Sequence, residues 1–450
     1  MAELPRRRRK AVDGLDKIPS TEQEWLEMVT TYCLVNAKLQ DLCSYGRPLK
    51  YFNRMPKEAF LTVRCIWPEM MAVGDALPYI LRTGSYFSEE HVAQATKLIN
   101  RKLLGLDKLD TLFDVICSQT KTPREWLCTL ADGLGPFSML VSLKRQILDK
   151  GLHTAPREEP LPITYAPRKK GHYNASQSSS GQMPDSPTPR HPKRLRLGDF
   201  GAMDDHPALG EPSTPPNIEL PEDTLDEIPD DIPDPRTPTE TLVVDFMVNL
   251  LGGLACLLQP LAYRTVCVAN AFETTYQFGP LPNGPIASNH VQFRARIDGS
   301  IPFSLPPDKN LPEMVIFEAK RAHRETGQGV TVVGQQSMEH VAYIWKRHKN
   351  DQLPRNPGTY HTFMIAQDFL SFYISIGTYD KEYLDYIFSP GDVPVVAQRG
   401  KKHLLRIQEF GPFQVDERDE MELLIHIILC LIISQLTPTN EGDLIQKALS

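Results

Sequence analysis

The chain has 450 residues, of which 41% are hydrophobic, and its formal net charge at pH 7 is −7. This length and composition suffice for two or three domains with substantial hydrophobic cores. The negative balance does not fit an obligate non-specific nucleic-acid binder, which carries excess positive charge to match the phosphates. None of the eight cysteines forms a Cys-x-x-Cys pair, so we expect buried free thiols and no structural zinc site.

The chain starts with charged residues rather than an apolar run, which does not fit a secretory signal. Its most apolar run, residues 423–436, contains His426, Ser434 and Gln435 and is too short to cross a bilayer. We therefore expect this run to be a buried helix, and we expect no association with a membrane.

Residues 1–19 are expected to form a basic disordered tail, and residues 20–152 show a helical pattern throughout. Thr21 and Glu24 have the spacing of a capping box, in which a threonine side chain accepts a hydrogen bond from the start of a helix. No nucleotide-binding loop and no His/Cys cluster occurs in this part of the sequence. We predict a separate all-helical domain that docks an unknown protein partner.

Residues 153–236 are rich in proline and lack a sustained apolar period, which predicts a disordered linker. Within it, the basic run from Arg190 to Arg196 resembles a nuclear localisation signal, and the run from Arg6 to Lys10 is a second candidate. An import receptor could bind such a run, so we expect the protein to be nuclear or nucleocytoplasmic.

The C-terminal part of the sequence alternates between helical and strand-like patterns. We expect helices at residues 238–259, 334–349 and 417–436, and strands at residues 266–278, 291–298, 314–317, 362–366, 370–376 and 404–410. This order predicts an α/β domain at residues 237–436, with a central mixed sheet flanked by helices, followed by a tail at residues 437–450.

Three charged residues end two successive strands of this predicted sheet. Residues 291–298 alternate between apolar and polar side chains, with Asp298 on the polar face, and the run 314–317 is followed by Glu318 and Lys320. Two carboxylates on adjacent strands can hold Mg²⁺ or Mn²⁺, which in turn binds phosphate oxygens. A nearby lysine can orient or deprotonate the attacking water, or offset charge in the transition state. The pattern therefore predicts metal-dependent phosphodiester chemistry.

The helix expected after the second strand adds further candidates. Gln336, His340 and Tyr343 are spaced at i, i+4 and i+7 and therefore share one helical face. Gln336 and Tyr343 could position the phosphate or the water. Gln335, one position off that face, competes with Gln336 for this role. The structural alternative is an ordinary amphipathic helix whose polar residues meet solvent.

Asp298 followed by Glu318-Ala319-Lys320 resembles the PD-(D/E)XK nuclease superfamily, with Ile297 in place of its proline. Residues 291–343, together with residues 404–436, resemble fungal proteins that carry such a domain at the C-terminus. The resemblance implies a restriction-endonuclease-like fold and a Mg²⁺- or Mn²⁺-dependent nuclease that acts on DNA or RNA.

The resemblance also implies a role for each candidate residue. Asp298, Glu318 and the carbonyl oxygen of Ala319 would bind the metal, and Lys320 would serve the water or the transition state. Gln336 and Tyr343 would complete the site.

A non-catalytic interaction scaffold that keeps the nuclease fold is the second hypothesis, because a fold does not guarantee a chemistry. The intact set of two acids and a lysine favours the enzyme. The acidic balance and the large helical half favour the scaffold. The sequence leaves open whether the substrate is DNA or RNA, whether cutting is internal or terminal, and the oligomeric state.

Overall fold

The computed structural model describes residues 17–39, 42, 57–83, 86–117, 133–153, 238–261, 269, 271, 274–281, 291–301, 315–320, 329–349, 359–388 and 403–436. The chain divides into two compact units, one made of Met1–Ala155 with Arg236–Ser450 and the other of Pro156–Pro235. All described residues belong to the first unit. The predicted linker apart from His153, both basic runs and the C-terminal tail lie outside the described residues; His153 is the last residue of helix α7, Ser138–His153.

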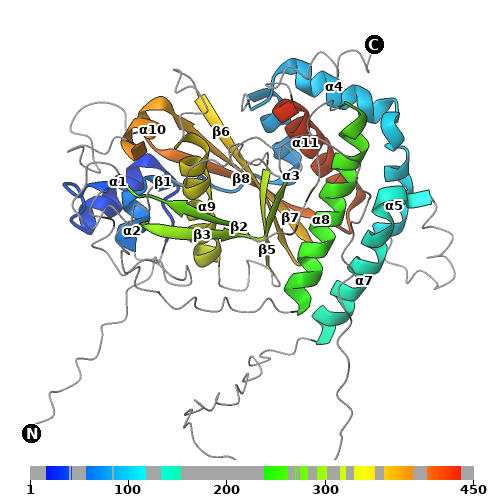
Figure 1. Ribbon diagram of the computed structural model, residues 1–450, viewed down its shortest axis with the longest axis horizontal. Coiled ribbons are helices and arrows are strands. Elements are labelled where there is room, and N and C mark those ends of the chain that lie inside the picture. Colours follow the sequence, from blue (N-terminus) through cyan, green and yellow to red (C-terminus); the bar gives the residue numbers. More distant parts are fainter. Residues whose placement is uncertain are drawn as a thin grey trace, which may run out of the picture. The chain divides into compact units, whose positions relative to one another are not determined.

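A six-stranded mixed sheet forms the centre of the first unit (Figure 1). The strand order is β1-β8-β7-β6-β5-β4. The bounds are β1 Cys65–Ile66, β4 Gly299–Ile301, β5 Val315–Lys320, β6 Thr359–Asp368, β7 Ser371–Asp380 and β8 Leu405–Gln414. The β1–β8 and β5–β6 pairs are parallel and the other pairs are antiparallel. A separate antiparallel ribbon joins β2, Thr274–Phe278, to β3, Phe293–Ile297. The expected mixed sheet is confirmed.

Apolar side chains on both faces of the sheet join hydrophobic cores built with helices. Ile316 and Met364 belong to the core that contains α9 (Gly329–His348) and the β2–β3 ribbon. Phe317 and Ile365, the next residue in each strand, belong to the core that contains α8 (Pro238–Leu258) and α11 (Arg418–Leu436). Successive residues of a strand point to opposite faces. We call these the α9 face and the α8 face. Burial on both faces explains why the strands β5 and β6 are continuous apolar runs in the sequence.

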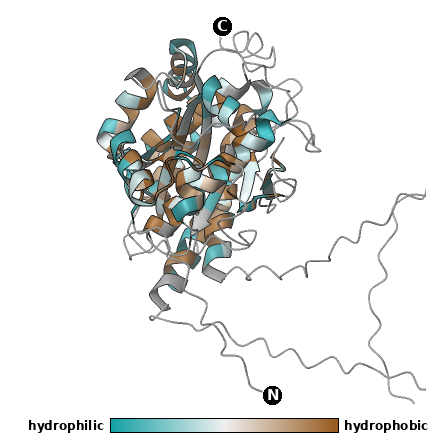
Figure 2. Ribbon diagram, turned by 90° about the vertical axis from the view of Figure 1, so that its left-hand side faces the viewer, coloured by the Kyte–Doolittle hydropathy of each residue, from teal (hydrophilic) through white to brown (hydrophobic). Residues whose placement is uncertain are grey.

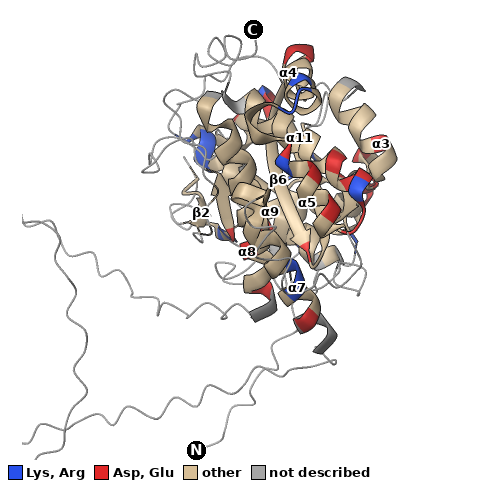
Figure 3. Cartoon of the chain, turned by 90° about the vertical axis from the view of Figure 1, so that its right-hand side faces the viewer, with Lys and Arg blue, Asp and Glu red and all other residues tan. Residues whose placement is uncertain are grey.

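The other helices surround these cores. They are α1 Glu22–Thr31, α2 Lys57–Thr62, α3 Val73–Pro78, α4 Glu89–Asn100, α5 Lys108–Ile116, α7 Ser138–His153 and α10 Lys381–Phe388, with short turns η3 Tyr79–Thr83, η4 Leu103–Gly105, η5 Gly135–Phe137 and η6 Gln259–Leu261. Figure 2 shows helices that carry both hydrophobic and hydrophilic residues, as amphipathic helices do. Figure 3 shows acidic residues on α4, α5 and α7. At the start of α1, Thr21 Oγ1 accepts a hydrogen bond from Glu24 N (3.1 Å), which confirms the predicted cap.

The N-terminal segment shares both cores with the C-terminal half, so the expected separate all-helical domain is not confirmed. Strand β1, which the helical pattern did not predict, pairs with β8. Trp67 Nε1 donates to Ser337 Oγ on α9 (2.6 Å), and the Tyr383 hydroxyl donates to the Val63 carbonyl (2.9 Å). The described N-terminal helices therefore complete the α/β unit. The apolar faces of two distant chain segments match each other, and no local pattern reveals such a match.

Helix α8 packs against α7, η5 and β5. Its segment Glu240–Leu258 is the one stretch among the described residues that is long and apolar enough to cross a membrane. In the structure Val243, Leu250 and Leu254 of this segment are fully buried in the core. Their burial gives the apolar character of α8 a packing explanation.

Two neighbouring glycines of α8 give a matched test of this packing. A methyl group on Gly253 would lie 2.4 Å from Cε1 of the buried Phe137 ring, whereas a methyl group on Gly252 would make an ordinary contact of 3.7 Å with Ala269 Cβ. We expect Gly253→Ala to lower the free energy of unfolding by about 1–3 kcal/mol. Gly252→Ala should leave it unchanged or raise it by up to about 1 kcal/mol, because alanine favours helix. Denaturant unfolding of both variants checks this, and equal effects would contradict the packing.

Candidate functional site

The backbones of Asp298 and Glu318 are neighbours at the point where β4 and β5 begin to pair. Asp298 forms the bend between β3 and β4, and its N–H donates to the Phe317 carbonyl (3.2 Å), one residue from Glu318. The β4–β5 ladder begins at the next pair, Gly299 with Phe317. Both acids are buried, with 4% and 2% of their surfaces exposed. The structure thus brings two carboxylate residues of adjacent strands together in the interior.

Glu318 points to the α9 face, where Gln335 holds it. Gln335 Nε2 donates to Glu318 Oε1 (2.8 Å) and to Glu339 Oε1 (2.7 Å). An amide nitrogen has two N–H donors, so this nitrogen can serve both carboxylates at once. Glu339 is fully buried. Each buried carboxylate costs several kcal/mol of desolvation, which favours the approach of a cation. Gln335, the competing choice at the sequence level, is the glutamine that contacts the predicted acid.

Gln336, next to Gln335 in α9, is buried, with 1% of its surface exposed. Among the described residues, neither its amide oxygen nor its amide nitrogen has a hydrogen-bond partner. His340, one turn later on the same helical face, bonds Thr362 and Ser375 of the sheet, so this face of α9 lies against the sheet. An unsatisfied buried polar group costs about 1–3 kcal/mol. A polar ligand next to Gln336 would remove that cost.

The carboxyl ends of β5 and β6 carry further polar positions. Lys320, the last residue of β5, pairs with Asp368, and Ala319 pairs with Gln367. The side chains of Ala319 and Lys320 lie outside the described part of the chain. Asp368 is fully buried, and the sequence interpretation did not include it. The signal that could have found it is an acid at the end of a strand-like run, as Asp298 is at the end of the alternating run 291–298.

Tyr343 and His340, two further residues of α9, pack against or bond residues of the strands. Tyr343 packs against Tyr276 of β2, with ring centroids 5.9 Å apart. It lies seven residues beyond Gln336, roughly 10 Å along the helix, so the structure does not bring it to Glu318. Both ring nitrogens of His340 bond hydroxyls, Thr362 Oγ1 at 2.8 Å and Ser375 Oγ at 2.9 Å. Burial lowers the pKa of His340 to about 3, which keeps the ring neutral at pH 7.

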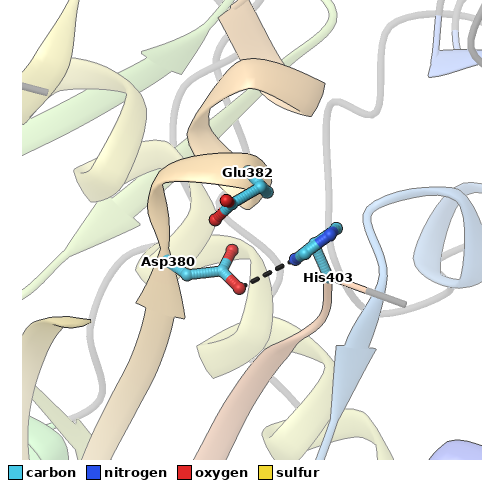
Figure 4. Close-up of side chains that lie close together, drawn as sticks. All are labelled: Asp380, Glu382 and His403. Carbon is cyan, nitrogen blue, oxygen red and sulfur yellow. Dashed lines mark hydrogen bonds and ion pairs between the residues drawn. The ribbon is translucent and has the colours of Figure 1, made fainter. Parts of the chain in front are cut away.

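A second group of polar side chains could hold a metal ion. Among the described residues, three acid or histidine ligand atoms lie within 4.8 Å of one another at one place, formed by Asp380, Glu382 and His403 (Figure 4). Asp380 ends β7, Glu382 lies in the first turn of α10, and His403 precedes β8. His403 Nδ1 lies 2.8 Å from Asp380 Oδ2. The sequence interpretation missed this group, because its only local signal is an Asp-x-Glu.

The two places lie at opposite ends of the sheet. Asp380 pairs with Thr359 at the start of β6, whereas Lys320 pairs with Asp368 at its end. Glu318 pairs with Ala366, seven residues along β6 from Thr359, so at about 3.3 Å per residue the two places are roughly 23 Å apart along the strand. They cannot share one ion.

Comparisons of the chain with protein-family models, with curated proteins and with solved structures found no match.

Proposed function

We propose that the protein hydrolyses nucleic-acid phosphodiester bonds with the help of a divalent cation held by Asp298 and Glu318. The observation that supports this most is the hydrogen bond from Asp298 N to the carbonyl before Glu318, which brings the two buried acids side by side where the β4–β5 ladder begins. Their position fits the expected order of an acid on one strand and Glu-x-Lys on the next. They also lie near the carboxyl ends of the parallel β5–β6 pair, where open α/β sheets commonly bind ligands.

The donor set fits magnesium or manganese. Carboxylate oxygens of Asp298 and Glu318, with the Ala319 carbonyl, form the oxygen-only environment that these hard ions prefer. The amide of Gln336 has no hydrogen-bond partner in the described part of the chain, and a bound phosphate or water would satisfy it. A cation bound here would act as a Lewis acid and as a template for the phosphate.

The residues of the chain then have distinct tasks. Gln335 fixes the carboxylate of Glu318 through a hydrogen bond of 2.8 Å, so little reorganisation is needed when charge develops. Gln336 can donate to a phosphate oxygen or orient a water. We assign Lys320 to the attacking water or to the transition-state charge, because its position i+2 from Glu318 places both on one face of β5.

One observation favours the scaffold instead. The hydrogen bonds from Gln335 to Glu318 and Glu339 give each buried acid a structural partner, and buried charges are stabilised by such bonds. A protein that kept this network for stability alone would need no cation and no substrate.

The experiment that separates the two is a cleavage assay with the purified full-length chain. Single- and double-stranded DNA and RNA are incubated with Mg²⁺, with Mn²⁺, or with EDTA. We expect cleavage of at least one substrate that requires the cation and stops in EDTA. No cleavage of any of the four substrates with either ion would contradict the proposal and favour the scaffold.

A further inference from the structure

The group formed by Asp380, Glu382 and His403 joins the junction of β7 and α10 to the segment that enters β8. Asp380 is the last residue of β7 and caps α10, because its Oδ1 accepts a hydrogen bond from Tyr383 N (2.8 Å). Its other oxygen, Oδ2, faces His403 Nδ1 at 2.8 Å. Glu382 follows in the first turn of α10. Figure 4 shows the Glu382 carboxylate on the same side as the Asp380 carboxylate and the imidazole.

The three side chains are accessible to an ion from solvent. The side chains of Asp380 and His403 are 41% and 27% exposed, and Glu382 is exposed. Lys381, the nearest cation in sequence, is paired with Asp385 (2.6 Å), so its ammonium is engaged with an acid outside the group. Two carboxylates and a neutral imidazole carry two negative charges, which a divalent ion would neutralise. The N-terminus of α10 opposes a cation, but by only about 0.3–1 kcal/mol.

The donor types select the class of ion. Imidazole nitrogen with carboxylate oxygens suits Zn²⁺, Co²⁺ or Ni²⁺, whereas Mg²⁺ prefers an environment of oxygens alone. Three protein ligands leave at least one position for water. We propose that Asp380, Glu382 and His403 bind one Zn²⁺ ion, which clips the end of β7 and the start of α10 to the segment that enters β8. The clip is separate from the site proposed for catalysis and does not depend on it.

The proposal is tested by calorimetric titration of the full-length protein after treatment with a chelator. We expect one Zn²⁺ ion to bind per chain at this group, more tightly than Mg²⁺, and Co²⁺ in its place to give a visible absorption band. Zn²⁺ should also raise the melting temperature by about 2 °C or more, because an ion that binds only the folded chain stabilises it. Absence of Zn²⁺ binding would overturn the proposal.

Variants locate the ion. Asp380→Asn removes a charged ligand yet keeps a good helix cap, and Glu382→Gln and His403→Gln remove the other two. Loss of a residue that only hydrogen-bonds a metal ligand weakens metal binding about 10–100-fold. Loss of a ligand itself should therefore lower the Zn²⁺ affinity of each variant at least about tenfold. Asp419→Asn, which changes an exposed acid in the first turn of α11, is the matched control and should bind normally. If all three variants keep wild-type affinity, the ion binds elsewhere, for example at the exposed Cys33 or Cys256, and the assignment is wrong.

Discussion

Glu318→Gln in the full-length chain is expected to reduce cation-dependent cleavage of nucleic acid at least about 100-fold. Loss of one preorganised group that stabilises transition-state charge, such as one donor of an oxyanion hole, costs a factor of about 10²–10³ in rate. The substitution removes the negative charge that binds the cation and changes the shape of the side chain very little. Asp298→Asn is expected to have an effect of the same order, because both acids would hold one ion. Single-turnover cleavage with saturating Mg²⁺ or Mn²⁺ measures both effects.

The same two variants are expected to remain folded. In the wild-type chain Gln335 Nε2 lies 2.8 Å from Glu318 Oε1. Glutamine at position 318 still offers an oxygen to this nitrogen. It also removes a buried charge whose desolvation costs several kcal/mol. The melting temperature of Glu318→Gln in EDTA should therefore equal or exceed that of the wild type. Lost activity without lost stability separates a catalytic role from a structural one.

Glu382→Gln is the control for the position of the catalytic site. It makes the same substitution, glutamate to glutamine, in α10 near the start of β6, far from Glu318, so it should leave cleavage unchanged. If Glu382→Gln abolished cleavage while Glu318→Gln did not, the reaction would depend on the group with Asp380 and His403. Cleavage that survives in all three variants would point to a contaminating nuclease.

Local patterns predicted the elements that surround the proposed site. The alternation over residues 291–298 gave β3 at Phe293–Ile297, and the apolar run before Glu318 gave β5 at Val315–Lys320. The helical spacing of Gln336 and His340 gave α9. These elements are encoded in side-chain periods of two and 3.6 residues, which a single sequence displays. Adjacency of Asp298 and Glu318 comes instead from β4, which the local patterns did not predict: β4 follows Asp298 and pairs with β5, whereas β3 pairs with β2 in the separate ribbon.

Long-range pairings account for what the sequence did not reveal. Strand β1 has two residues, Cys65 and Ile66, and no period can be recognised in two residues. It forms only because β8 offers a free edge. The group with Asp380 and His403 is likewise set by the β7–β8 pairing. The i, i+4, i+7 spacing favoured Gln336 over Gln335, but the long side chain of Gln335 reaches Glu318 from one position away. Helical spacing predicts the direction in which a side chain leaves the helix, but it does not predict how far a long side chain extends.

A fragment of residues 237–450, the predicted nuclease-like domain with its tail, is expected not to fold cooperatively by itself. It lacks β1, which would leave the edge of β8 unpaired and prone to aggregation. It also lacks α4, α5 and α7, whose residues Leu98, Leu112 and Leu140 share one core with α8 and α11. Circular dichroism and a thermal melt should show no sharp transition, whereas the full-length chain should give one.

Specific hydrogen bonds add to this loss. The N-terminal segment bonds the C-terminal half through Leu405 N to the Arg64 carbonyl (2.9 Å), Met71 N to the Glu409 carbonyl (2.9 Å) and Gln408 Nε2 to the Glu69 carbonyl (2.8 Å). Each such bond contributes about 1 kcal/mol. The total stability of a folded protein is only about 5–15 kcal/mol. Loss of these bonds and of the shared core is therefore comparable with the whole stability.

Replacement of residues 156–235 by a Gly/Ser segment of equal length is the matched control. That segment forms the second unit, so its removal should leave the cooperative melt of the first unit in place. Co-expression of residues 1–155 with residues 237–450 should restore the fold, because the contacts between them are non-covalent. A fragment 237–450 that melts cooperatively within a few degrees of the full-length chain would show that the N-terminal helices are an addition to the α/β unit and not part of it. In that case cleavage by the fragment alone would also be expected. If the prediction holds, every assay of Asp298 and Glu318 requires both halves of the chain.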